Sequence, residues 1–346
     1  MFKSMNRLSE RRISGKKIAQ FSMDYAIYIV LVCIFAVMVF IDPSLLTLKN
    51  LTFILSQAST RVILALGVAG IIVLGNTDLS LGRSVGMAGI LAASLLQASD
   101  YSRRIFANMP DLPVWLPIAG AMVLCALFSM AQCFFVSKLK VAPFIASLAF
   151  QLVLFGVQSI YFDVVNNSSP IGGLNEAYKK LAQGRFVIGS FELPYLIIYA
   201  AIAVAVIWFI WNKTVLGRNM FAIGGNSDAS AVSGINITKN MMLIYLIAGL
   251  MYGLGGSLEA ARTGSAANTL GAGYECDAIA ACVAGGVSMR GGVGTVGGVV
   301  IGVLIFQLIS YGLVYLSVNP YLQYIIKGAI ILLAVSIDTQ KYVSKK

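Results

Sequence analysis

Polar and acidic side chains stand in two glycine-rich segments that interrupt an otherwise apolar sequence. The first segment, residues 75–86, reads GNTDLSLGRSVG, and the second, residues 271–292, reads GAGYECDAIAACVAGGVSMRGG. Amide, hydroxyl, phenol and carboxyl groups can all hydrogen bond to a polar ligand. The side chains with that capacity, together with Gln57 in the preceding apolar run, are Asn76, Asp78, Ser80, Tyr274, Glu275 and Asp277.

The sequence contains no histidine, and this narrows the chemistry that these groups can perform. Proton relays through imidazole, histidine–metal sites and serine–histidine catalysis are all removed. The cysteines form no C-x-x-C pair and lie mostly in apolar runs, which is typical of small buried hydrophobic residues. They are Cys33, Cys125, Cys133, Cys276 and Cys282. The composition therefore predicts no metal site and disfavours an intramembrane enzyme.

The elements that must position these residues are membrane-spanning helices. Of the 346 residues, 58% are hydrophobic and only 11% are charged, whereas soluble domains carry about 25% charged residues. Apolar runs near the length of a bilayer crossing recur along the chain. We expect an all-α polytopic membrane protein of about ten spans. The expected spans are 25–41, 61–76, 84–98, 114–136, 142–162, 194–211, 241–258, 278–289, 293–316 and 321–337.

The net charge of +11 is concentrated in the two tails. Basic residues that flank apolar spans mark the cytoplasmic side of a membrane, so orientation explains them better than nucleic-acid binding. The sequence therefore predicts a basic cytoplasmic tail over residues 1–24, a transmembrane domain over 25–337 and a second basic cytoplasmic tail over 338–346.

Counting spans from a cytoplasmic N-terminus places the two glycine-rich segments on opposite faces of the membrane. Each segment also adjoins an unusually short span. Interrupted segments at corresponding positions of two inverted halves indicate a transport pathway. The sequence leaves two interpretations open: an inverted internal repeat, or two unrelated loops of small residues.

Glycines recur at every fourth position in one expected span, at Gly294, Gly298 and Gly302. Small residues at this spacing let two helices approach closely. We expect them to serve packing within the chain rather than a dedicated dimer contact.

The stretch LGRNMFAIGGNSDASAVSGINITKN, residues 216–240, breaks the apolar pattern on the expected cytoplasmic side. Asn226 can cap a helix, Asp228 suits its first turn, and Gly234 can end it in the left-handed conformation. Such a short helix is marginal by itself and needs a surface to hold it. Either it docks into a groove of a cytoplasmic partner, or it packs on its own protein.

No G-x-x-x-x-G-K-[ST] phosphate loop occurs in the sequence. If ATP drives this protein, a separate chain must therefore bind the nucleotide.

Three stretches together resemble the ribose-type sugar permeases of bacterial ABC importers. They are GRNMFAIGGNSDASAVSGIN, NTDLSLGRSVG and YECDAIAACVAGGVSMRGGVGT. Within that family, ILSQASTRVILALGVAGIIVLGNTDLSLGR and NPYLQYIIKGAIILLAVSIDTQKY are most similar to galactose/methyl-galactoside permeases. The similarity runs from about Tyr25 to the C-terminus. Where the family usually has Gly-Ile-Asp, this chain has Asn76-Thr77-Asp78, which keeps the aspartate.

The resemblance implies a complete import machine in the bacterial inner membrane. It implies a homodimer of this chain surrounded by lipid, a periplasmic galactose-binding protein, and a cytoplasmic ATPase subunit that holds ATP and Mg²⁺. It implies no cofactor on this chain. It also implies that the short helix, about Ser227 to Ser233, inserts into the ATPase. The residues of this docking loop would be Gly217, Arg218, Gly224, Gly225, Asn226, Ser227, Asp228, Ala229, Val232, Ser233 and Gly234.

The implied mechanism is alternating access, in which the ATPase moves the docked helices and opens the pathway to each face in turn. A neutral sugar needs hydrogen-bonding groups rather than a charged pocket, so the seven polar residues named first are candidates for the pathway. Other roles remain open for them: Asp78 and Ser80 can cap the following helix, and Glu275 and Asp277 can face solvent or the binding protein. A permease for ribose or xylose and an ion-coupled transporter are the alternative functions.

Lys327 lies within the last apolar run. Charge inside a membrane is costly and often functional, but a lysine at this depth can also extend to the interface. An ion pair between Lys327 and Asp277 is the functional hypothesis.

Overall fold

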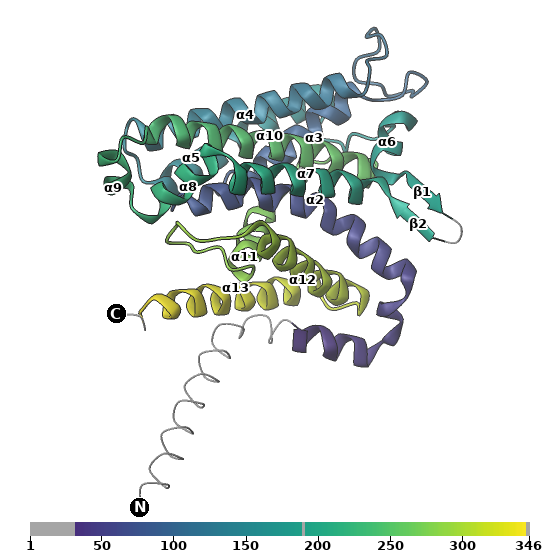
Figure 1. The fold of residues 1–346 in the computed structure, drawn as a ribbon. Coiled ribbons are helices and arrows are strands. Elements are labelled where there is room, and N and C mark those ends of the chain that lie inside the picture. Colours follow the sequence, from purple (N-terminus) through teal and green to yellow (C-terminus); the bar gives the residue numbers. More distant parts are fainter. Residues whose placement is uncertain (1–31, 189–190, 344–346) are drawn as a thin grey trace, which may run out of the picture.

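The computed structural model describes residues 32–188 and 191–343 as a bundle of helices with one small β-hairpin (Figure 1). The predicted N-terminal tail, the first part of the span expected at 25–41 and the last three residues of the C-terminal tail lie outside the described residues. The remaining residues predicted for the C-terminal tail continue the last helix as far as Val343.

The helices follow the order of the predicted spans. A helix over Val32–Ile41 comes first. It is followed by η1 (Pro43–Leu46), α2 (Leu48–Val73), α3 (Leu81–Leu95), α4 (Trp115–Ser137), α5 (Pro143–Asn166), α6 (Glu176–Gln183), α7 (Tyr195–Lys213), α8 (Val215–Gly225), α9 (Ser227–Val232), α10 (Ile237–Thr263), α11 (Tyr274–Ala284), α12 (Val296–Tyr315) and α13 (Pro320–Val343).

Six of the described helices are long and apolar enough to cross a membrane: α2, α4, α5, α7, α10 and α12. Two helices in predicted spans are clearly shorter. With 15 residues, α3 is about 22 Å long, and with 11 residues α11 is about 16 Å long. A bilayer core is about 30 Å thick. Each of these two helices therefore covers only part of the membrane.

Helix α2 is longer than predicted, because it begins at Leu48 rather than near residue 61. Its first half carries Lys49, Asn50 and Gln57, which lower the hydropathy of that stretch without breaking a helix. Hydropathy alone therefore placed the start of this span too late.

The two central helices, α2 and α10, hold the bundle together, and α10 packs against α4 and α3 (Figure 1). Gly249 and Gly253, one turn apart on α10, make the approach to α4 close. A Cβ on Gly253 would lie 2.4 Å from the Cα of Met122, and one on Gly249 would lie 2.5 Å from the Cα of Ala126. Dispersion contacts between backbones replace side-chain packing here.

Gly298 and Gly302 of α12 serve packing within the chain, as predicted, and so does Gly294 before that helix, where a Cβ would lie 3.1 Å from Val73 Cγ2. A Cβ on Gly298 would lie 2.1 Å from the carbonyl oxygen of Gly285, and one on Gly302 would lie 2.1 Å from that of Ala281. These contacts join α12 to α11 and to the turn that follows it.

The all-α prediction is confirmed, and the described residues add one small β-hairpin that was not predicted. Strands β1 (Arg185–Ile188) and β2 (Phe191–Pro194) form an antiparallel hairpin in which Arg185 pairs with Pro194. The hairpin follows α6, whose Asn175 cap accepts a hydrogen bond from the Ala177 N–H. It lies at the opposite end of the bundle from α9 (Figure 1). These two ends are called the hairpin end and the α9 end below.

The close approach of α10 and α4 gives a first prediction. Gly253→Val should destabilise the protein by about 1–3 kcal/mol or more, because the new side chain would overlap the α4 backbone. Thermal unfolding of the purified protein in detergent measures this. The matched control is Gly156→Val on α5, where a Cβ meets nothing within 4 Å. Equal melting temperatures for the two variants would contradict the packing described here.

Candidate functional site

The two short helices begin beside each other in the middle of the molecule. Before α3, residues 74–80 break the chain after α2, and before α11, residues 264–273 break it after α10. The first turn of α3 meets the second break at two glycines. A Cβ on Gly82 would lie 2.5 Å from the carbonyl oxygen of Gly271, and one on Gly271 would lie 2.1 Å from that of Gly82. Gly271 also has a φ of +80°, so only glycine fits there without strain.

Asp78 is fully buried and organises the first break. Its Oδ1 accepts hydrogen bonds from the Ser80 N–H at 2.9 Å, the Ser80 hydroxyl at 2.7 Å and the Gln132 amide at 3.2 Å. Its Oδ2 accepts one from the Tyr252 hydroxyl at 3.0 Å. A buried carboxylate costs much less free energy when donors surround it in this way. Asp78 thus ties the break to α4 and α10.

A second buried carboxylate, Glu259 of α10, organises the second break. It accepts hydrogen bonds from Arg262 at 2.8 and 3.0 Å, from the Thr60 hydroxyl at 2.8 Å and from the Tyr274 hydroxyl at 2.8 Å. A second cation, Arg61, lies 3.7 Å from Glu259, and its guanidinium stacks 3.1 Å above the ring centre of Tyr274. Two guanidinium groups therefore share one carboxylate, and the cluster carries a net positive charge.

The predicted contact between Lys327 and Asp277 is confirmed. The Lys327 Nζ donates to Asp277 Oδ2 at 3.0 Å, with both side chains about a quarter exposed. The pair joins α13 to the first turn of α11. Snorkelling to the interface, the alternative interpretation of Lys327, is not needed to explain its position.

The predicted polar residues separate into two groups. Tyr274 and Asp277 line one small cavity between α2, α11 and α12, together with Arg61 and Gln307. Gln57 borders the same region, because it accepts a 2.7 Å hydrogen bond from Gln307. Half-buried Glu275 lies against α3, where its Oε2 is 2.0 Å from the Cβ position of Gly82.

The remaining predicted residues, Asn76, Asp78 and Ser80, are buried in the first break. The Ser80 side chain makes no capping bond to α3 but donates to Asp78 and contacts Gln132 at 3.0 Å. The Ser80 side chain therefore does not cap α3, whereas Asp78 accepts from the Ser80 N–H at the start of that helix.

Sequence reasoning missed the partners that these residues meet across the fold. They are Arg61, Gln132, Tyr252, Glu259, Arg262 and Gln307. Two of them could have been suspected from the sequence, because Arg61 and Gln132 lie inside apolar runs. Polar groups at such positions in a membrane protein need partners. Nothing in the sequence says which partners they find.

Helix α9 matches the prediction made for the exposed stretch. The Oδ1 of Asn226 accepts a hydrogen bond from the Ala229 N–H at 2.9 Å, and Gly234 ends the helix with a φ of +83°. Most of the helix faces outward: Val232 is 91% exposed, whereas Ser230 is buried against its own chain. The exposed members of the predicted docking loop are Arg218, Gly225, Asn226, Ser227, Asp228, Ala229, Val232, Ser233 and Gly234.

The residues directly before α9 were expected to be part of a docking loop because many of them are small. They form the helix α8 instead. Gly217 is buried within this chain, and Gly224 is packed closely: a Cβ there would lie 1.8 Å from the carbonyl oxygen of Val73. That oxygen also accepts a 2.8 Å hydrogen bond from the Gly292 N–H. The end of α8 therefore contacts both the end of α2 and the turn between α11 and α12.

Comparison with known proteins gives a consistent result. A family model described as branched-chain amino acid transport system / permease component matches residues 50–335. The chain is 49% identical over 334 residues to a galactose/methyl galactoside import permease protein of Escherichia coli, covering 96% of this chain and 99% of that protein. To the protein of that name from Haemophilus influenzae it is 50% identical, covering 93% and 95%. To the ribose import permease protein of Escherichia coli it is 34% identical, covering 96% and 100%. No solved structure matches the chain.

The pair between α11 and α13 gives a second prediction. Lys327→Met should lower the free energy of unfolding by an amount on the order of 1 kcal/mol, because Asp277 keeps a half-buried charge without its partner. Adding Asp277→Asn should recover most of that loss, and Lys327→Arg should lose little. Thermal unfolding in detergent compares these three variants and the single variant Asp277→Asn with the parent. Losses that simply add in the double variant would contradict a direct pair.

Proposed function

The chain belongs to the branched-chain amino acid transport system / permease component family, and from this premise we propose that it imports galactose or a methyl galactoside. It is a membrane permease, with several helices long enough to cross a bilayer. The substrate rests on one observation: relatives named for galactose and methyl galactoside are 49–50% identical over nearly the whole chain. The relative named for ribose is 34% identical. Ribose or xylose is the alternative substrate.

The transport mechanism that we propose is alternating access between two inverted halves with about ten spans in all. In the first half, a 26-residue helix is followed by a break and a 15-residue helix. In the second half, a 27-residue helix is followed by a break and an 11-residue helix. The first unit ends its long helix at the α9 end, where Val73 contacts α8, and the second begins its long helix there. Discontinuous helices in such inverted units typically surround a transport pathway.

The power for import would come from a separate ATPase chain that holds ATP and Mg²⁺ in the cytoplasm. The surface that supports this is α9, a short exposed helix with an almost fully exposed Val232. Gly224 of α8 would then transmit movement of α9 to the first break and to the turn after α11, because it touches the end of α2 and that turn. In this arrangement the α9 end and both termini face the cytoplasm.

The complete machine would contain two copies of this chain in the inner membrane and a periplasmic galactose-binding protein at the hairpin end. Helices α4, α5 and α7 leave large apolar side chains exposed, among them Leu127, Leu152 and Phe209. Lipid and a second copy would cover these surfaces. Nucleic acid has no part in this proposal, because the basic residues are explained by orientation.

The third prediction tests the substrate and the source of power. Vesicles that contain this chain, the ATPase and the loaded binding protein should accumulate radiolabelled galactose only with internal ATP and Mg²⁺. Ribose and xylose, each with the same binding protein, should accumulate far less. Uptake driven by an ion gradient, with the ATPase left out, would instead establish a stand-alone secondary transporter.

The fourth prediction tests docking through α9. Val232→Asp should reduce co-purification of the ATPase at least about tenfold, because a charge would replace an apolar anchor in the contact. Thermal stability of the permease alone should not change, since Val232 is 91% exposed. The matched control is Val215→Asp on the neighbouring helix α8, where the valine is 60% exposed. Equal losses in both variants would show that α9 is not the specific contact.

A further inference from the structure

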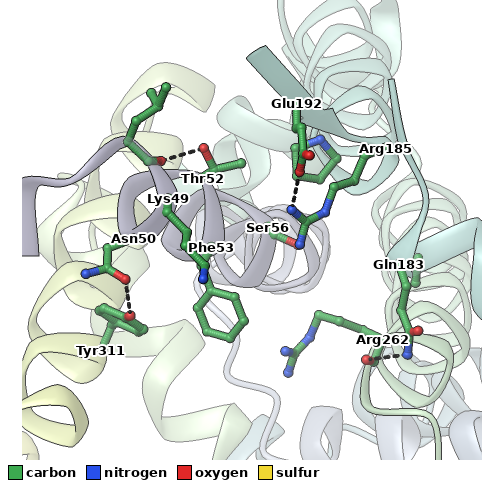
Figure 2. A pocket seen from close by; sticks show the side chains of 13 residues that line it. Lys49, Asn50, Thr52, Phe53, Ser56, Gln183, Arg185, Glu192, Arg262 and Tyr311 are labelled. Atoms are coloured by element: carbon green, nitrogen blue, oxygen red, sulfur yellow. Dashed lines mark hydrogen bonds and ion pairs between the residues drawn. The ribbon is translucent and has the colours of Figure 1, made fainter. Parts of the chain in front are cut away.

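A large pocket lies at the hairpin end, where the first turns of α2 face the hairpin and α12. Its volume is about 970 Å³, within the range of about 300–1,000 Å³ that small-molecule sites occupy. Figure 2 shows side chains from α2, the hairpin and α12 around the open space, with the Lys49 ammonium and the Arg262 guanidinium directed toward it. Positive groups therefore stand on two walls of the pocket.

The uncharged polar groups of this pocket are already hydrogen-bonded within the chain. The Asn50 amide donates to the Ser44 carbonyl oxygen, and its Oδ1 meets the Tyr311 hydroxyl at 3.1 Å. The Gln183 amide donates to carbonyl oxygens in the last turn of α10, and the Thr52 hydroxyl donates to its own helix. These groups have little left to offer a ligand, so the charged side chains decide what the pocket attracts.

The charged side chains of the lining are Lys49, Arg185, Glu192 and Arg262. Three cations and one carboxylate give the lining a net charge of +2. Arg185 pairs with Glu192 across the hairpin, and Arg262 shares the Glu259 carboxylate with Arg61, which leaves that cluster positive. The exposed Lys49 ammonium forms no ion pair with any described carboxylate. The pocket therefore attracts an anion.

An apolar groove continues from this pocket along α2, α7 and α12. Its volume is about 530 Å³. On α2, Ser56 lines the pocket and Ser59, one turn further on, lines the groove; Pro194 and Ile197 do the same at the start of α7. The Ser59 hydroxyl donates to the Leu55 carbonyl oxygen of its own helix, so the wall of the groove is apolar.

The pocket and the groove lie at different depths of the membrane. Lys49 is 24 residues from Val73 along α2, which is about 36 Å of helix. A hydrocarbon core is about 30 Å thick, so a helix α2 that ends at one face carries Lys49 to the headgroup level of the other. The groove runs from Ile197 to Trp208 along α7, about 16 Å. That length is close to the depth of one hydrocarbon leaflet, about 15 Å.

We propose that the pocket and the groove together bind one anionic phospholipid. Its phosphate would lie between Lys49 and Arg262, and one acyl chain would lie between α2 and α7. A headgroup with net negative charge, such as phosphatidylglycerol, suits a lining of +2, whereas the choline of phosphatidylcholine cancels the charge of its phosphate. The inference requires only that the chain is embedded in a bilayer, and it does not depend on the transported sugar.

Native mass spectrometry of the full chain tests the headgroup contact, after release from nanodiscs of equal parts phosphatidylglycerol and phosphatidylcholine. The parent should retain phosphatidylglycerol in preference. Lys49→Gln should lower the ratio of retained phosphatidylglycerol to phosphatidylcholine about fivefold, the factor that one cation near an anionic surface contributes. The matched control is Arg103→Gln, which removes an exposed cation from the loop between α3 and α4. It should leave the ratio unchanged, because Arg103 is not part of the pocket lining.

A second pair of variants tests the acyl chain in the same nanodiscs. Ala201→Trp would fill the groove from α7 and should reduce the retention of both lipids, because it displaces the chain that they share. Ile202→Trp on the next residue, which is 57% exposed and does not line the groove, should have no such effect. All four substituted residues are exposed, so the fold should tolerate each change.

Equal retention of the two lipids by the parent would overturn the proposal, and so would equal effects of Lys49→Gln and Arg103→Gln. A free anion is the other possible occupant of the pocket. If inorganic phosphate abolishes the preference for phosphatidylglycerol while Ala201→Trp changes nothing, the site binds a free anion and the lipid assignment is wrong.

Discussion

The structure depends on one contact, the crossing of two backbones at Gly82 and Gly271. Irregular backbone at membrane depth is tolerated only where protein covers it, because lipid offers no hydrogen-bond partners. Here each break in the helical pattern is covered by the other half of the molecule. A side chain at either glycine would hold the two helix starts apart and expose both breaks. The two short helices can therefore exist only together.

The buried carboxylates on either side of this crossing make the breaks specific. Asp78 gathers donors from α4 and α10, and Glu259 gathers donors from α2 and α11. Losing one partner would leave a buried polar group unsatisfied, which costs about 1–3 kcal/mol and more for a charged group. Each break is thus held in one conformation by partners on other helices. A change of conformation must exchange these hydrogen bonds for others, which makes the breaks suitable places for two discrete states.

The α9 end connects to the first break and to the turn after α11 through backbone rather than through side chains. Gly224 lies in close contact with the carbonyl oxygen of Val73, the last residue of α2. The same oxygen accepts a hydrogen bond from the Gly292 N–H. Two segments in direct backbone contact have little freedom to move independently, because no flexible side chain lies between them. A displacement of α8 would therefore reach α2 and the turn after α11 together. On the proposed function, this joint would link nucleotide hydrolysis at the α9 end to the end of α2 and the turn after α11.

The sequence by itself determined the features that depend on neighbouring residues and on hydropathy. It predicted the series of apolar helices, the cap at Asn226, the end of α9 at Gly234 and the packing glycines of α12. Short-range hydrogen bonds and side-chain type are sufficient for all of these. The sequence left two interpretations of Lys327 open, an ion pair with Asp277 and extension to the interface, and the structure has the ion pair.

Only the tertiary structure decided how the interrupted segments meet. Tyr252 reaches Asp78 across 174 positions of sequence, and Gln307 reaches Gln57 across 250. Such pairs depend on which helices lie side by side, and hydropathy is the same for every arrangement that buries the same surface. For the same reason α8 formed despite its glycines, because packing against α2 outweighs a low local propensity. The hairpin and the early start of α2 likewise come from the fold, since their polar residues find partners and solvent at the hairpin end.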